Sequence, residues 1–288
     1  MYKRYLLLSI FMLSIAWAGL GVAQEWKELG SDHFIVYFNG DEKFAKEVLS
    51  NAEVYYRSIA QDLGYPRYSQ FWLWDDRAKI YIYPDHASFL KATGQPKWSA
   101  GMADYPTRSI ISYAWSKDFM HSLLPHEMAH LIFRDFVGFK GEIPLWLDEG
   151  VAQWAEKKKR KMMKSMVEKL YMEDKLLLVS DLTSLDIRRF KDMDDRVFIR
   201  EIRTRQGEPG VLFLDINHLV DTYYLESVAV VGFLIERYGS ARFADFCREL
   251  RDGKMLEDAF RSAYPVHITS LNELEDNWRK YLEEGINK

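Results

Sequence analysis

The chain of 288 residues is poor in cysteine and has no excess of basic residues. Its single cysteine, Cys247, excludes an intrachain disulfide framework and any metal or iron–sulfur site built from several cysteines. Lys and Arg number 39 against 43 Asp and Glu, so a net charge of −4 offers no basic surplus for nucleic acid. Histidine is also scarce, with 7 residues, and the spacing of these few residues is therefore informative.

Long hydrophobic runs are rare as well, and the clearest one is at the N-terminus. A short basic start precedes an uncharged run over 5–20, and the small residues Gly21 and Ala23 follow it. This layout is typical of a secretory signal, so we expect cleavage after Ala23 and an exported mature protein, periplasmic or secreted. An uncleaved N-terminal anchor is the alternative. We expect no stable membrane span once residues 1–23 are removed.

The rest of the chain predicts a small sheet followed by helices. Runs of β-branched and aromatic residues predict strands at 33–38, 79–83 and 108–114. Helical periodicity predicts helices at 41–63, 85–92, 122–137, 145–172, 221–238, 240–251 and 270–284. We therefore expect an α+β fold in one domain over 24–288, with a sheet-bearing part at about 24–120 and a helical part at about 121–288.

The residues that carry chemistry are concentrated in Leu124–Ile132, which contains the pattern H-E-x-x-H. Four residues turn 400° on a helix, so His126 and His130 project from one face and can bind the same metal ion. Glu127 lies about 100° round the helix from His126, where it can take a proton from a metal-bound water. The alternative is a buried helix that carries two incidental histidines.

A second segment contains a candidate for a third ligand. Between His130 and Glu149 lie 18 residues, and Glu149 belongs to the sequence W-L-D-E-G-V-A. This spacing and segment resemble the H-E-x-x-H-x18-E pattern and the W-L-N-E-G-F-A segment of aminopeptidase-N-type gluzincin metallopeptidases, with Asp148 in place of Asn. The resemblance implies that His126, His130 and Glu149 hold one Zn²⁺ per chain and leave a fourth position open for water. We expect Gly150 to let the second helix pack close to the first.

A third segment, Tyr224–Leu234, resembles the helix of the same enzymes whose tyrosine stabilises the tetrahedral intermediate. Tyr224 takes the position of that tyrosine, and its neighbour Tyr223 is the alternative. Glu226 and Ser227 replace the Lys and Gly of the family, so the match depends mainly on the apolar pattern.

The chain also departs from the aminopeptidases. Those enzymes carry a G-x-M-E-N segment whose Glu binds the free amine of the substrate, whereas Ser99–Tyr105 reads S-A-G-M-A-D-Y. Without that Glu, aminopeptidase activity is not supported. We still expect Arg108–Tyr113 to be the edge strand that lines the cleft and pairs with an extended substrate. The chain more closely resembles the small exported proteins of the peptidase MA-like family, which implies a zincin-like fold with a small mixed sheet, an H-E-x-x-H helix and a helical lobe.

Together these features predict an exported zinc metallopeptidase. We expect this hydrolase to be an endopeptidase that acts on a peptide or protein. Glu127 would be the general base, and Tyr224 would stabilise the oxyanion. The alternative is a non-catalytic, zinc-bearing binding or assembly protein of the cell envelope. The chain also contains a basic run, which consists of Lys157, Lys158, Lys159, Arg160 and Lys161. Such a run indicates either a solvated helix face or a contact with an anionic envelope surface.

Overall fold

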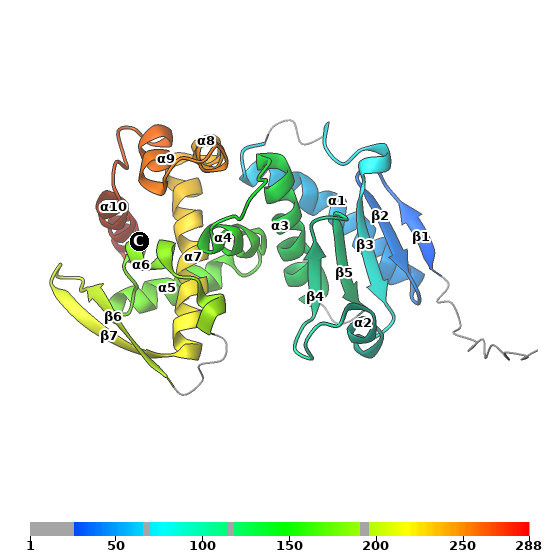
Figure 1. Ribbon diagram of the computed structural model, residues 1–288, viewed down its shortest axis with the longest axis horizontal. Helices are drawn as coiled ribbons and strands as arrows, with labels where there is room; N and C mark the ends of the chain where they lie inside the picture. Colours follow the sequence, from blue (N-terminus) through cyan, green and yellow to red (C-terminus); the bar gives the residue numbers. More distant parts are fainter. Residues whose placement is uncertain (1–25, 66–69, 115–117, 191–195, 288) are drawn as a thin grey trace, which may run out of the picture.

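The computed structural model describes residues 26–65, 70–114, 118–190 and 196–287. The predicted signal segment, 1–23, lies outside the described residues. In Figure 1 a sheet and its helices lie on one side, and the helices of the C-terminal half lie on the other. Between them lie α3 (Leu124–Val137) and α4 (Leu145–Ala155), which carry the predicted ligands. The predicted α+β class is confirmed.

Five strands form one mixed sheet in the order β1-β2-β3-β5-β4. Their bounds are β1 Lys27–Gly30, β2 Phe34–Phe38, β3 Ala78–Tyr83, β4 Gly101–Asp104 and β5 Ser109–Tyr113. The three inner strands β2, β3 and β5 are parallel, and each outer strand is antiparallel to its neighbour. The prediction that Arg108–Tyr113 forms the edge is wrong, because β4 pairs outside β5. The short sequence Gly-Met-Ala-Asp of β4 has too little β-branched character to predict a strand.

One face of this sheet is buried and the other is partly exposed. Phe34, Val36 and Phe38 alternate with half-exposed residues along β2 and belong to the main hydrophobic core. The helix α1 (Glu42–Asp62) packs against β2 and contributes buried residues to the same core. Helix α2 (His86–Thr93) also packs against the sheet, where it contacts the strands β5 and β3. The sheet thus supports the helix α3 through a shared core.

The helical half differs from the sequence prediction in several places. The predicted helix 145–172 is two helices, α4 and α5, because the chain turns at 156–159. The hairpin over 197–215 and the short helices over 179–184 and 256–263 were not predicted. The bounds are α5 Arg160–Met172, α6 Val179–Ser184, β6 Val197–Arg203, β7 Pro209–Asp215, α7 Ile216–Tyr238, α8 Ser240–Arg251, α9 Leu256–Ala263 and α10 Leu271–Ile286. Single turns of 3₁₀ or π type lie at Trp74–Asp76, Phe119–Leu123 and Ile187–Phe190.

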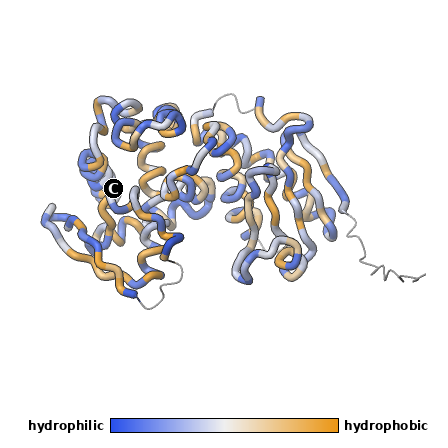
Figure 2. Tube along the Cα trace, in the orientation of Figure 1, coloured by the Kyte–Doolittle hydropathy of each residue, from blue (hydrophilic) through white to orange (hydrophobic). Residues whose placement is uncertain are grey.

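Helix α7 is the central helix of this half. By length and composition alone it could cross a membrane, which the sequence analysis did not anticipate, but 61% of its apolar window is buried within the protein. Figure 2 shows hydrophobic residues along α7 and along the inner strands of the sheet. A Cβ on Gly150 would lie 2.6 Å from the carbonyl oxygen of Ser227 on α7. Gly150 therefore allows α4 to approach α7, and the expectation that it serves the contact with α3 is wrong.

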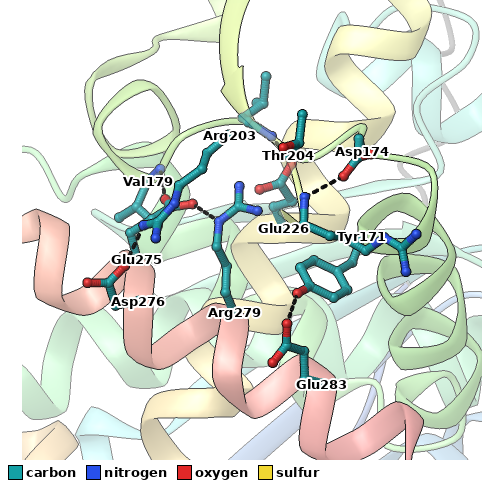
Figure 3. A network of polar contacts seen from close by, with 12 residues as sticks. Tyr171, Asp174, Val179, Arg203, Thr204, Glu226, Glu275, Asp276, Arg279 and Glu283 are labelled. Atoms are coloured by element: carbon teal, nitrogen blue, oxygen red, sulfur yellow. Dashed lines mark hydrogen bonds and ion pairs between the residues drawn. The ribbon is translucent and has the colours of Figure 1, made fainter. Parts of the chain in front are cut away.

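A buried polar network joins α7 and α10 to the chain before α6 (Figure 3). Glu226 is fully buried and accepts a hydrogen bond of 2.8 Å from the backbone N–H of Leu177. Glu275 accepts a hydrogen bond of 2.7 Å from the N–H of Val179 and also pairs with Arg279. Burial raises the pKa of Glu226 well above its ordinary value of 4.5, although the bond from Leu177 opposes this shift. Glu226 is thus a structural residue in this fold.

Candidate metal centre

The helix α3 brings the two histidines of the motif onto one face. A π turn over Phe119–Leu123 runs directly into α3, and Pro125 lies in the first turn, where its missing N–H has no helical acceptor to lose. The rings of His126 and His130 have their centroids 5.0 Å apart. The remaining residues of α3 are mostly buried and apolar, so the helix is held firmly in the core.

The structure brings Glu149 of α4 to these two histidines. One potential ligand atom from each of the three residues lies within 4.8 Å of the other two. Nε2 of His126 is 3.8 Å from Oε2 of Glu149. Ligand atoms bound to a tetrahedral zinc ion are about 3.4 Å apart, given bond lengths of about 2.1 Å. The three residues therefore form a group that could hold a metal ion after small side-chain movements.

Each histidine is oriented by a carboxylate behind it. Nδ1 of His130 is 3.0 Å from Oδ1 of Asp148, and Nδ1 of His126 is 3.1 Å from Oε1 of Glu156. A proton on Nδ1 makes each ring a hydrogen-bond donor to its carboxylate, and the lone pair of Nε2 is then available to a metal ion. Carboxylates that bind the second nitrogen of a histidine ligand are typical of metal sites, where they fix the tautomer and the ring orientation.

The electrostatic field at the site favours a cation. Burial lowers the pKa of His130, but the negative charges of Asp148, Glu149 and Glu127 outweigh burial and raise the pKa to about 9. Such a site stabilises a positive charge at the buried imidazole, whether the charge is a proton or a metal ion. Burial also acts on Glu156, but hydrogen bonds from His126, Lys159 and Ser122 prevail and lower its pKa below 4.5. Glu156 is thus a charged carboxylate, although only 5% of the residue is exposed to solvent.

The group formed by these three residues lines a cleft of about 400 Å³. Glu127 lines this cleft and is not a member of the ligand group, as the helical geometry predicted. The edge strand β4 contributes Met102 and Ala103 to the wall of the cleft. Two cationic residues, Arg134 and Arg188, also line the cleft. The site therefore combines a metal-ligand group, a carboxylate beside it and a strand edge.

The predicted tyrosines lie on α7, which packs against α4. Tyr224 is partly buried, and its pKa is raised to about 12 by burial and then by the negative charge of Glu149. Tyr223 is fully buried, and its hydroxyl donates to the carbonyl oxygen of Leu185 at 3.3 Å. Among the described residues that line the cleft, however, the tyrosine is Tyr105. The structure thus brings Tyr224 near Glu149 without making it part of the cleft wall.

Tyr105 is a residue of the cleft to which no role was assigned from the sequence. It follows the edge strand β4, and the guanidinium carbon of Arg134 lies 4.4 Å from the centre of its ring. Burial raises its pKa, and the negative charges of Asp148, Glu127 and Glu149 act in the same direction. No spacing rule connects Tyr105 to the H-E-x-x-H motif, so its presence in the cleft follows only from the packing of the sheet on α3.

Asp148 and Glu156 also received no role from the sequence. A signal for Asp148 was present, because it immediately precedes the predicted ligand Glu149. Glu156 follows Glu149 by seven residues and lies directly after the end of α4, where the chain leaves the helix. Charged residues near a motif are common, however, and only the fold shows that these two carboxylates face the histidines.

The basic run divides into residues with and without acidic partners. Lys157 and Arg160 pair with Asp62, at 3.3 and 2.6 Å, and Lys159 pairs with Glu156 at 2.7 Å. Among the described residues, Lys158 and Lys161 form no ion pair with a carboxylate. The run is therefore only in part the solvated face that its composition predicts.

No model of a known protein family matches this chain, and no curated protein matches it in sequence.

Proposed function

We propose that the protein is an exported zinc metallopeptidase of the gluzincin type, with a zincin-like fold, and that it cleaves within peptide or protein chains. The observation that carries this proposal is the group formed by His126, His130 and Glu149 in an open cleft that also contains Glu127. A purely structural metal site is usually closed by four protein ligands, whereas three ligands and an open side are typical of catalytic zinc.

The residues of the chain fit a zinc ion. Two imidazole nitrogens and one carboxylate oxygen form a ligand set typical of zinc peptidases, and the carboxylates of Asp148 and Glu156 orient both rings. A bound zinc ion would supply Lewis-acid chemistry: it would polarise the scissile carbonyl and make water a better nucleophile near neutral pH.

The remaining steps belong to side chains. Glu127 takes a proton from the water that attacks the scissile carbonyl and then delivers it to the nitrogen of the leaving amine. Tyr224 donates a hydrogen bond to the oxygen that gains negative charge during the attack. The strand edge of β4 binds the substrate in an extended conformation, through backbone hydrogen bonds alongside Met102 and Ala103.

The comparison of wild type with Glu127→Ala tests this proposal. Both proteins should contain about one zinc ion per chain, and wild type should cleave an unbiased peptide library, whereas Glu127→Ala should lose activity by a factor of about 10²–10⁴. The exposed residue Glu47 on α1 gives a matched control, because Glu47→Ala removes the same group far from the cleft. Zinc binding without cleavage by wild type would instead favour a non-catalytic binding or assembly protein of the cell envelope.

A further inference from the structure

A second cavity lies among the helices of the C-terminal half, apart from the metal cleft. It has a volume of about 230 Å³, and its walls come from the end of α4 and from α5, α7 and α10. None of its lining residues also lines the metal cleft. Trp154 follows Glu149 by five residues, a rotation of 140° beyond one full turn, so the cavity lies across α4 from the metal ligands.

The body of this cavity is apolar. Its walls are formed mainly by aliphatic and aromatic side chains, among them Met163, Val167, Val228, Ala229, Phe233 and Leu282. Gly232 shapes one wall, because a Cβ there would lie 2.4 Å from the ring of Trp154. Trp154 and Trp278 also line the cavity, and each keeps a buried indole N–H with no acceptor among the described residues.

The rim of the cavity is cationic. Lys161 and Lys164 line it, and both are exposed. Neither pairs with a carboxylate in the described parts of the chain, and the ammonium nitrogen of Lys164 lies 5.5 Å from the centre of the Tyr281 ring. Arg160 also lines it but is engaged by Asp62 and lies over the ring of Trp154.

One acidic residue also lines the cavity. It is Glu236, which accepts a hydrogen bond from the hydroxyl of Tyr281. Three cationic side chains and one carboxylate therefore line the apolar cavity, and the predicted basic run supplies two of the cations, Arg160 and Lys161.

We infer that this cavity binds a single-chain amphiphile with a negatively charged end, of the alkyl carboxylate class. The alkyl chain would occupy the apolar interior, and the carboxylate would lie at the rim beside Lys161 and Lys164. The volume favours one chain over two, because cavities for larger ligands usually measure about 300–1,000 Å³. Buried apolar area would supply most of the binding free energy, and the lysines would select the sign of the head group.

Calorimetric titration of the purified protein with dodecanoate, below its micelle-forming concentration, tests this inference. We expect one dodecanoate per chain, and no comparable binding of dodecyltrimethylammonium, whose head group carries the opposite charge. Lys164→Glu should weaken binding about three- to tenfold, since it replaces an attraction with a repulsion at an exposed site. Lys158→Glu makes the same charge change in the basic run but off the cavity, so it should leave the affinity unchanged.

A variant that fills the cavity provides a second test of the binding site. Ala229→Phe should abolish binding, and a melting curve checks that this variant is folded. Equal binding of both amphiphiles, or equal effects of Lys164→Glu and Lys158→Glu, would overturn the assignment of the head group. No binding by wild type, or full binding by folded Ala229→Phe, would overturn the site itself. None of these readouts depends on peptidase activity, so the inference can fail without affecting the proposed function.

Discussion

Asp148 and His130 form a hydrogen bond of 3.0 Å between Oδ1 and Nδ1, although they lie on different helices. The residue after Asp148 is the predicted ligand Glu149, so one turn of α4 supplies both a ligand and the group that orients another ligand. Movement of α4 relative to α3 would therefore disturb two of the three ligands together. Four measurements follow from this arrangement and from the surrounding fold.

The first measurement concerns the ligands. His126→Ala and Glu149→Ala each remove one of three donors, so we expect either variant to lose most of its zinc after dialysis. His121→Ala is the matched control, because His121 contacts the hydroxyl of Tyr55 and lies outside the ligand group. Metal content by elemental analysis gives the result. Retention of zinc at full affinity by either ligand variant would show that the ligand set is wrong.

The second measurement concerns the orienting carboxylate. Asp148→Ala removes the acceptor of the Nδ1–H of His130, and the loss of such a group weakens metal binding by a factor of about 10–100. Asp148→Asn keeps an acceptor oxygen and should restore most of the affinity. Competition with a chromophoric chelator measures both. Equal affinities of wild type and Asp148→Ala would mean that this hydrogen bond does not support the metal.

The third measurement separates the tyrosines. Tyr224→Phe removes one hydroxyl and little volume, so fold and zinc content should be retained while kcat falls by a factor of about 10²–10³. KM should change little, because the hydrogen bond forms mainly in the transition state. Tyr223→Phe should have nearly wild-type kcat, since the hydroxyl of Tyr223 donates to Leu185. If Tyr105→Phe loses kcat and Tyr224→Phe does not, the tyrosine of the cleft wall has the role assigned to Tyr224.

The fourth measurement concerns pH and stability. Burial raises the pKa of Glu226 on folding, so the folded protein binds this proton more tightly than the unfolded chain. The free energy of unfolding therefore falls as pH rises above 4.5, by about 1.4 kcal/mol for each unit of raised pKa once the carboxyl is ionised in both states. Glu226→Gln removes this dependence and keeps an acceptor for Leu177.

Denaturant unfolding at several pH values tests this reasoning. We expect Glu226→Gln to match wild type near pH 4 and to be progressively more stable than wild type as pH rises to about 8. Glu47→Gln, at an exposed position on α1, should show no such trend. A stability difference that is the same at every pH would mean that Glu226 is not held neutral by burial.

The sequence alone located the candidate ligands because their geometry is local. His126 and His130 are separated by about one helical turn, so any helix over this segment brings them together. The inner strands β2, β3 and β5 and the helices α1 and α2 were predicted for the same local reason, whereas the outer strands β1 and β4 were not. The division of 145–172 into two helices was not predictable, because the turn at Glu156 depends on its bonds to His126, Ser122 and Lys159. The identity of the edge strand depended likewise on pairing across the sheet.

Tertiary structure decided the contacts between residues that are distant in sequence. The spacing of Glu149 from His130 suggested a ligand only by resemblance, and the packing of α4 on α3 brings the two residues together. The roles of Asp148 and Glu156, and the place of Tyr105 in the cleft, depend on the same packing. Periodicity records which face of a helix is apolar but not which partner covers it, and for that physical reason the helix that meets Gly150 could not be predicted.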